Sequence, residues 1–409
     1  MESANLIAGL ARLVRDVAIA EDLAQDAMVI ALEKWPESGI PKNPGAWLMA
    51  TAKHRAIDAL RRQGTLAKKQ EELARQLEID DGMESSAAPT GNRSDEDLLS
   101  LIFICCHPVL STDARISLAL RLLGGLTTTE IARAFLVSEP TIAQRIVRAK
   151  RTLAQAEATF EMPEGNELTT RLASVLEVIY LIFNEGYLAT AGEDLVRLAL
   201  CEEALRLGRV LAGLVPTEPE VHGLVALMEI QASRLRARVG PGGEPVLLYA
   251  QNRSRWDQLL IRRGLVALQR AEKLGGSHGR YALQAAIAGC HARAPSPEET
   301  DWARITELYG RLAGAAPSPV VELNRAVAVA MAFGPAAGLE IVDRLASEPS
   351  LKAYHLLPGV RGDLLEQLGR FREARSEFER AASLTSNKRE RGLLLDRAAT
   401  CNRLEAEPL

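Results

Sequence analysis

The chain has 409 residues, of which 47% are hydrophobic, 25% charged and 4% aromatic, and its formal net charge is −4. A protein that coats nucleic acid non-specifically is usually basic throughout, so any DNA contact must come from local basic faces. The length predicts two to four domains, and the scarcity of aromatic residues favours an all-α fold. No apolar run approaches the ~20 residues of a membrane span and the N-terminus is not a signal peptide, so we expect a cytoplasmic protein with no membrane partner.

The first 62 residues are predicted to form three helices. Apolar residues recur at helical spacing over 6–17, 20–35 and 46–62, and a loop rich in Pro and Gly separates the last two. The second helix opens with acids and an amide at Asp22, Gln25 and Asp26. Acids near a helix N-terminus favour the helix dipole, which is the plain structural explanation. The same side chains equally suit a docking surface for a basic partner.

The third helix combines an aromatic residue with a set of cations. Trp47 stands near its start, and the basic side chains that follow are Lys53, His54, Arg55, Arg61 and Arg62. We expect Trp47 to belong to the core, although a Trp at the start of a basic helix also suits an unstacked base. His54 has no metal-binding or catalytic companion, so we assign it to the polar face.

A polar and then acidic stretch separates these helices from a second apolar region. A polar helix from Lys68 leads into an acidic tract rich in Ser, Gly and Ala that reads as a linker. Apolar helices are predicted next, over 98–123. Cys105, Cys106 and His107 lie there without a second pair of ligands at a suitable spacing, so we interpret the cysteines as core residues. The five cysteines show no pairing pattern, which predicts free thiols.

Residues 127–150 have the pattern of a helix-turn-helix. The first helix is predicted over 128–135, and Ser138 is a suitable N-cap for a second helix with Pro140 in its first turn. Leu136 stands where many such turns have Gly, so the turn is either strained or built differently. The second helix is predicted to turn a narrow apolar stripe inward, formed by Thr141, Ile142, Ile146 and Ala149. Its opposite face is polar and basic, and it carries Gln144, Arg145, Arg148 and Arg151. Such a helix suits a major groove, although a solvated basic face is the plain alternative.

The remaining chain is almost wholly helical in pattern. Its most aromatic patch is 180–187, which we expect to pack in the core, with contact to the preceding modules as the alternative. Near the end, small and large residues match the spacing of a tetratricopeptide repeat at Gly362, Leu365, Gly369, Ala374, Phe378 and Ala381. A weaker unit of this kind lies upstream, over 324–346.

In this order, the three motifs resemble those of a bacterial sigma factor of the extracytoplasmic-function (ECF) type. The family's polymerase-binding helix resembles AEDLAQDAMVIALEKW, its promoter-melting helix resembles NPGAWLMATAKHRAIDALRR, and its second DNA module resembles TTTEIARAFLVSEPTIAQRIVRAKRTL. The resemblance covers roughly residues 1–155. The remaining chain resembles the C-terminal extension of one subgroup, which is associated with small DGPF/YCII-type proteins. Two departures are a short first helix and Met28 in place of an aromatic.

The resemblance implies which residues bind which partner. Asp22, Gln25 and Asp26 would dock on core RNA polymerase. The −10 element would be bound by the loop 36–45 and by Trp47, Lys53, Arg55, Arg61 and Arg62. The −35 element would be bound by Thr141, Gln144, Arg145, Arg148 and Arg151, with Gln144 and Arg145 reading bases and the last two holding phosphates. The linker acids Asp80, Asp81, Glu84, Asp95, Glu96 and Asp97 would mimic nucleic acid near the RNA exit path, or would simply be solvated.

The resemblance also implies a domain order. Residues 1–67 would be sigma region 2, 68–96 the acidic linker and 97–155 sigma region 4. A helical extension over 156–290 and tetratricopeptide-like repeats over 291–409 would follow, regulating the protein and binding a DGPF/YCII-type protein or a peptide.

Three other functions are weaker. A helix-turn-helix regulator with a helical sensor domain would act without replacing the sigma subunit, but it leaves the first module unexplained. A repeat scaffold leaves both basic helices unexplained. An enzyme is least favoured, since the sequence has no catalytic constellation, phosphate-binding loop or dinucleotide fingerprint, and we expect no cofactor and no metal.

Overall fold

The computed structural model describes residues 2–62, 91–135, 137–156, 158, 160, 163, 165–187, 196–240 and 244–406. These residues form helices, and the only β-bridge among them joins Val239 and Pro245, which confirms the predicted all-α class. The chain divides into two compact units, an N-terminal unit of Met1–Leu181 and a C-terminal unit of Ile182–Leu409. None of the described helices is long and apolar enough to cross a membrane.

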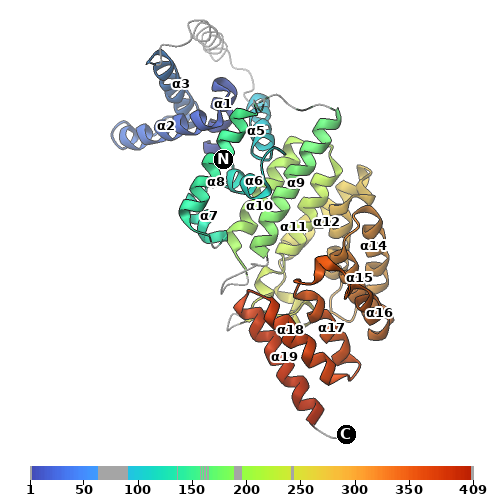
Figure 1. The fold of residues 1–409 in the computed structure, drawn as a ribbon. Coiled ribbons are helices and arrows are strands. Elements are labelled where there is room, and N and C mark those ends of the chain that lie inside the picture. Colours follow the sequence, from blue (N-terminus) through green and yellow to red (C-terminus); the bar gives the residue numbers. More distant parts are fainter. Residues whose placement is uncertain are drawn as a thin grey trace. The chain divides into compact units, whose positions relative to one another are not determined.

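The N-terminal unit opens with three helices, α1 (Glu2–Val14), α2 (Val17–Ser38) and α3 (Pro44–Arg62), which pack on one another (Figure 1). The predicted first helix, 6–17, was wrong at its end. It stops at Val14 because Arg15 takes a left-handed backbone (φ 55°), and Asp16 then caps α2 by accepting from the amide of Ala18 at 2.7 Å. The predicted loop 36–45 is shorter, because α2 continues through Pro36 to Ser38.

Five further helices of this unit lie among the described residues. They are α5 (Gly91–Cys105), α6 (Thr112–Leu122), α7 (Thr128–Phe135), α8 (Glu139–Gln155) and the first part of α9 (Gly165–Tyr187). The predicted helix 128–135 is confirmed to the residue. Helix α1 packs against α5, so the helices before and after the linker share one unit. Most of the linker lies outside the described residues, and so do the polar helix from Lys68 and the turn residue Leu136.

Helix α9 is anchored to the end of α5 by buried polar contacts. Arg171, only 6% exposed, donates from Nη2 to the carbonyl of Phe103 at 3.2 Å and lies over that residue's ring. Ser174 donates to the carbonyl of Cys106 at 2.7 Å. The Phe103 carbonyl lies in the last turn of α5, where helix carbonyls lack intrahelical partners, and the Cys106 carbonyl directly follows the helix. Helix α9 therefore supplies hydrogen bonds that α5 cannot make for itself.

The C-terminal unit is a succession of helices in which neighbours along the chain pack together. Their bounds are α10 (Leu198–Leu214), α11 (Pro219–Ala232), α12 (Gln258–Lys273), α13 (Arg280–Arg293), α14 (Trp302–Ala315), α15 (Pro319–Phe333), α16 (Pro335–Leu345), α17 (Leu356–Gln367), α18 (Phe371–Leu384) and α19 (Lys388–Ala406). Helix α11 is buried on almost every side. A side chain at its Gly223 would meet the backbone of Ala282 at 2.7 Å, so this glycine permits the close approach of α13.

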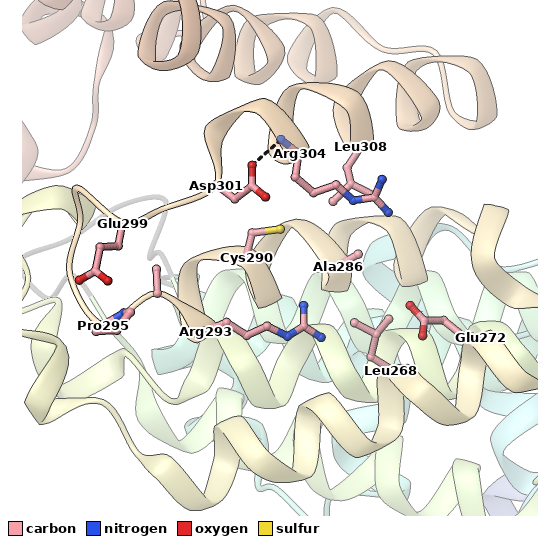
Figure 2. Close-up of a pocket in the computed structure, with 11 residues that line it drawn as sticks. Leu268, Glu272, Ala286, Cys290, Arg293, Pro295, Glu299, Asp301, Arg304 and Leu308 are labelled. Atoms are coloured by element: carbon pink, nitrogen blue, oxygen red, sulfur yellow. Dashed lines mark hydrogen bonds between the residues drawn. The ribbon is translucent and has the colours of Figure 1, made fainter.

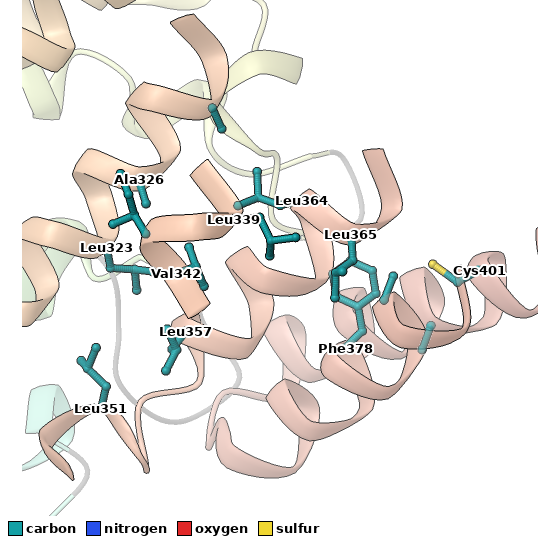
Figure 3. Packing of buried hydrophobic residues seen from close by; sticks show 14 residues of the cluster. Leu323, Ala326, Leu339, Val342, Leu351, Leu357, Leu364, Leu365, Phe378 and Cys401 are labelled. Atoms are coloured by element: carbon teal, nitrogen blue, oxygen red, sulfur yellow. The ribbon is translucent and has the colours of Figure 1, made fainter. Parts of the chain in front are cut away.

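The two repeat-like stretches form helix pairs, α15–α16 and α17–α18, and one apolar core runs through α15 to α19 (Figure 3). Phe378 is fully buried, as are Leu365, Ala374 and Ala381. The small-to-large contact is direct, because a Cβ at Gly362 would lie 2.8 Å from the Phe378 ring. In the predicted aromatic patch, 180–187, Phe183 and Tyr187 contact residues of the C-terminal unit. Phe183 is 1% exposed, and Tyr187 stacks on it and accepts from Arg234 at 2.7 Å.

Replacing the buried guanidinium of Arg171 should weaken the packing of α9 against α5. We expect Arg171→Leu to destabilise the N-terminal unit by about 1–3 kcal/mol, because the Phe103 carbonyl loses its buried donor. Hydrogen–deuterium exchange of α9 and α5 should accelerate. The control is Arg148→Leu, at an exposed position of α8, which should change stability by less than about 0.5 kcal/mol. Equal exchange in Arg171→Leu and the unmodified protein would contradict the role of this contact.

A methyl group at Gly362 should be costly. We expect Gly362→Ala to destabilise the C-terminal unit by about 1–3 kcal/mol, because the Phe378 ring must move. The matched control is Gly310→Ala in α14, where a Cβ meets nothing within 4 Å and better helix propensity should stabilise by about 0.5–1 kcal/mol. Thermal unfolding of the two variants should shift the midpoint in opposite directions, and shifts of one sign would refute the packing argument.

Candidate nucleic-acid interface

Local sequence builds the helix-turn-helix. Thr127 and Glu130 cap α7 reciprocally, since the Glu130 carboxylate accepts from the Thr127 amide at 2.8 Å and Thr127 Oγ1 accepts from the Glu130 amide at 3.2 Å. The two hydrogen bonds that the Glu130 carboxylate accepts from the Thr127 amide and hydroxyl hold the pKa of Glu130 below its usual value. Ser138 caps α8 as predicted, with extended backbone (φ −71°, ψ 146°) and its hydroxyl accepting from the Thr141 amide at 3.3 Å. Pro140 lies in the first turn of α8, where its missing N–H has no consequence.

One stripe of α8 is buried, and this sets the direction of every other side chain on the helix. The stripe consists of Ile142, Ile146, Ala149 and Leu153. The prediction that Thr141 belongs to this stripe was wrong, because Thr141 lies in the first turn of α8 and is exposed. Four of the five predicted DNA-binding residues lie on the exposed side, namely Thr141, Gln144, Arg148 and Arg151. The same face carries Val147, whose side chain is 64% exposed and which the sequence reading overlooked. Its position in the helical repeat, between Gln144 and Arg151, was the signal that could have identified it.

Arg145, the fifth predicted residue, lies at the flank of this face. Its Nη2 is 3.1 Å from Asp113 Oδ2 at the start of α6, and its side chain is 25% exposed. Between the two helices is a cavity of about 390 Å³ that is lined by Thr141, Gln144, Arg145 and Arg148 from α8 and by residues 109–111 and Ala114. Arg145 is therefore held toward α6 rather than straight outward from the helix.

The opposite flank of α8 reaches the first three helices. Lys150 Nζ and Arg121 Nε both bind the carboxylate of Glu21, which is 5% exposed; the Arg121 bond measures 2.8 Å. Gln25 donates to the same carboxylate at 3.0 Å. A carboxylate so deeply buried needs cations and donors around it, because water cannot solvate it. The sequence contains no signal for this contact, which joins residues 129 positions apart.

The predicted acidic surface on α2 is exposed, and it is broader than expected. Asp22, Gln25 and Asp26 lie on the solvent side. Because α2 begins at Val17, these residues are not in its first turn, so the helix-dipole explanation of the acids is wrong. The same helix face continues with Val29 and Leu32, which are 53% and 75% exposed. Acids at one end and exposed aliphatic groups at the other form a surface that suits a protein partner with basic and apolar groups.

The predicted residues of α3 are only partly brought together. Trp47 is half-buried, with its ring centroid 5.5 Å from that of Trp35 at a tilt of 60°. His54, which the sequence assigned to the polar face, is exposed, and it lies seven residues after Trp47 and therefore on the same side of the helix. Lys53 and Arg55 project from other sides of the helix. The side chains of Arg61 and Arg62 lie outside the described part of the structure.

The cysteines next to this interface are buried. Desolvation raises the pKa of Cys105, and it raises that of Cys106 to about 12, so both are neutral thiols in the packing of α5. All five cysteines are free. Among the described residues, no three His, Cys, Asp or Glu side chains gather as a metal ion would require.

Of the predicted linker acids, Asp80, Asp81 and Glu84 lie outside the described residues. Asp95 and Glu96 are exposed, and the Asp97 carboxylate pairs with the Arg12 guanidinium at 2.8 Å.

A second concave site lies within the C-terminal unit. It is a groove between α12, α13 and α14 (Figure 2), with Cys290 at its centre and a charged lining of Glu272, Arg293, Glu299, Asp301 and Arg304. Asp301 caps α14 by accepting from the amide of Arg304 at 2.9 Å. Burial raises the pKa of Cys290, which leaves the thiol protonated. Both signs of charge line this groove, which suits a polar segment rather than an apolar ligand.

Three segments of the chain match models of known protein families. Residues 2–65 match the family model described as Sigma-70 region 2, and residues 100–153 match Sigma-70, region 4. Residues 171–272 match a family of unknown function, DUF6596. A protein of Rhizobium meliloti described as uncharacterized is 45% identical over 384 residues, which make up 93% of this chain and 89% of the relative. The chain, with both sigma-70 DNA-binding regions in order in its N-terminal unit, belongs to the sigma-70 family, whose members bind RNA polymerase and recognise promoters.

Proposed function

We propose that this protein is a sigma factor of the ECF type, which binds core RNA polymerase and directs it to promoters by their −10 and −35 elements. The observation that carries the proposal is the exposure, on separate helices of one unit, of an acidic and aliphatic face on α2 and a basic face on α8. A helix-turn-helix regulator has use for the second face only. The two faces together suit a protein that binds polymerase and DNA at once.

Polymerase docking is assigned to α2. Asp22 and Asp26 supply charge for a basic partner, Gln25 supplies an amide, and Val29 and Leu32 supply apolar area. Exposed charges steer association and define the partner, while the aliphatic groups contribute affinity when water leaves them. We therefore expect a partner surface with both basic and apolar side chains, which fits the coiled-coil clamp implied by the family resemblance.

DNA binding is divided between α3 and α8. Trp47, with Lys53, Arg55, Arg61 and Arg62, is assigned to the melted −10 element, where a base can stack on an aromatic ring. Gln144 is assigned to a base edge of the −35 element, and Arg148 and Arg151 to phosphates. Arg145 would join in base reading only after releasing Asp113.

Run-off transcription tests the proposal as a whole. Purified core polymerase is combined with this protein on promoter fragments selected by the complex, and transcripts are compared with those made without it. If the protein is a sigma factor, core polymerase should make specific transcripts only in its presence. A regulator that leaves the sigma subunit in place would bind DNA by itself and yield no transcript with core polymerase alone.

Regulation is assigned to the C-terminal unit. Its helix pairs suit tetratricopeptide-like stacking with a concave surface for a protein segment, and the charged groove around Cys290 is one place for a peptide. A small DGPF/YCII-type partner stays a prediction of the resemblance. Such a partner regulates the DNA modules only if it binds one of their arrangements more tightly than another.

Charge reversal on α2 should impair docking. We expect Asp26→Arg to weaken binding to core polymerase by about 1–3 kcal/mol, because a cation would then face a basic surface. The matched control is Glu340→Arg, an exposed acid of α16, which should bind as the unmodified protein does. Fluorescence titration of labelled protein with core polymerase measures both. Identical affinities for the two variants would remove the α2 assignment.

The salt dependence of DNA binding should distinguish the residues of α8 that contact phosphates from those that contact bases. Arg151→Ala should weaken all −35 sequences alike and lower the slope of log K against log salt by about 0.9. Gln144→Ala should cost about 1–3 kcal/mol on the preferred sequence and relax one base position. Binding of −35 variants by holoenzyme at several salt concentrations measures both effects. A sequence-selective loss in Arg151→Ala would reverse the two roles.

Removal of the C-terminal unit should change initiation. Because α9 is held to α5, the informative truncation ends after Leu181 and not before α9. Full-length and truncated proteins are compared on one promoter for promoter affinity and transcript yield, with circular dichroism confirming that the truncated chain is folded. We expect promoter affinity or transcript yield to change. Equal values of both would show that the C-terminal unit does not regulate initiation.

A further inference from the structure

Val147 is an exposed aliphatic residue surrounded by polar ones. Its side chain is 64% exposed, while the apolar residues of the α8 stripe are buried. Gln144 lies one turn before it and Arg151 one turn after it, both exposed. A single exposed valine needs no explanation on an ordinary surface. Its place in the middle of the helix face assigned to DNA is what gives this one a function.

The major groove presents one apolar mark, the 5-methyl group of thymine. A valine suits this mark because its two methyl groups are held rigidly at one preferred χ1 angle in a helix. Contact withdraws both the thymine methyl and the valine from water, which favours binding. Gln144 and Arg151 on either side offer donors to base edges and phosphates, so the polar neighbours of a thymine would also be satisfied.

We infer that Val147 recognises the methyl group of a thymine in the −35 element and thereby determines sequence specificity at that position. The inference rests on the proposed function, in which α8 enters the major groove. It names a residue that reads by apolar contact, in addition to the hydrogen-bonding residues already assigned.

The test removes the methyl group from the DNA and the side chain from the protein. The preferred −35 sequence is first selected with holoenzyme, and each thymine on either strand is then replaced singly by uracil, which lacks only the methyl. We expect one replacement to weaken binding about fourfold, the effect of one methyl group returned to water. Val147→Ala should bind the thymine and uracil duplexes equally. The control is Val266→Ala, an equally exposed valine of α12, which should keep the preference for thymine.

Two results would overturn the inference. Either no thymine is sensitive to loss of its methyl, or Val147→Ala remains as sensitive as the unmodified protein. Failure of the proposed function has a different signature, because holoenzyme would then show no preferred −35 sequence at all and Gln144→Ala would leave selection unchanged. Retained sequence preference without a methyl effect refutes the role of Val147 alone.

Discussion

Burial of one stripe of α8 determines the layout of the whole candidate interface. Ile142, Ile146 and Ala149 occupy the inner side because the hydrophobic effect removes them from water. A helix is rigid, so this choice also fixes the outward direction of Gln144 and Val147. The residues on the two flanks of α8 then make different contacts, because Arg145 pairs with Asp113 and Lys150 pairs with Glu21.

The region that ends in the helix-turn-helix depends on a helix that its sequence pattern does not include. Arg171 and Ser174 of α9 complete the hydrogen bonding of α5, although the matched sigma-70 region ends at residue 153. The family match that begins at residue 171 therefore starts inside a helix whose first part belongs to the N-terminal unit. The extension thus begins as structural support for a DNA module, and its further helices form a separate unit.

Electrostatics within the N-terminal unit also has a consequence for function. A buried carboxylate is stabilised only while its cations stay in place, so a contact such as that of Glu21 favours one arrangement of its partners strongly. The neighbouring acids Asp22 and Asp26 differ from Glu21, because their side chains are exposed to water. Adjacent residues of one helix therefore divide between holding the protein together and offering charge to a partner.

The sequence by itself determined where the helices lie, which residues cap them and which side of an amphipathic helix is buried. Ser138, Pro140 and the apolar stripe of α8 predicted the second helix of the helix-turn-helix correctly, because capping and amphipathic spacing are short-range effects. Only the tertiary structure decided that Arg145 pairs with Asp113, that Glu21 is buried and that Arg171 holds α5. These contacts join residues 32 to 129 positions apart, and no local pattern encodes which charged side chain will meet which when helices pack.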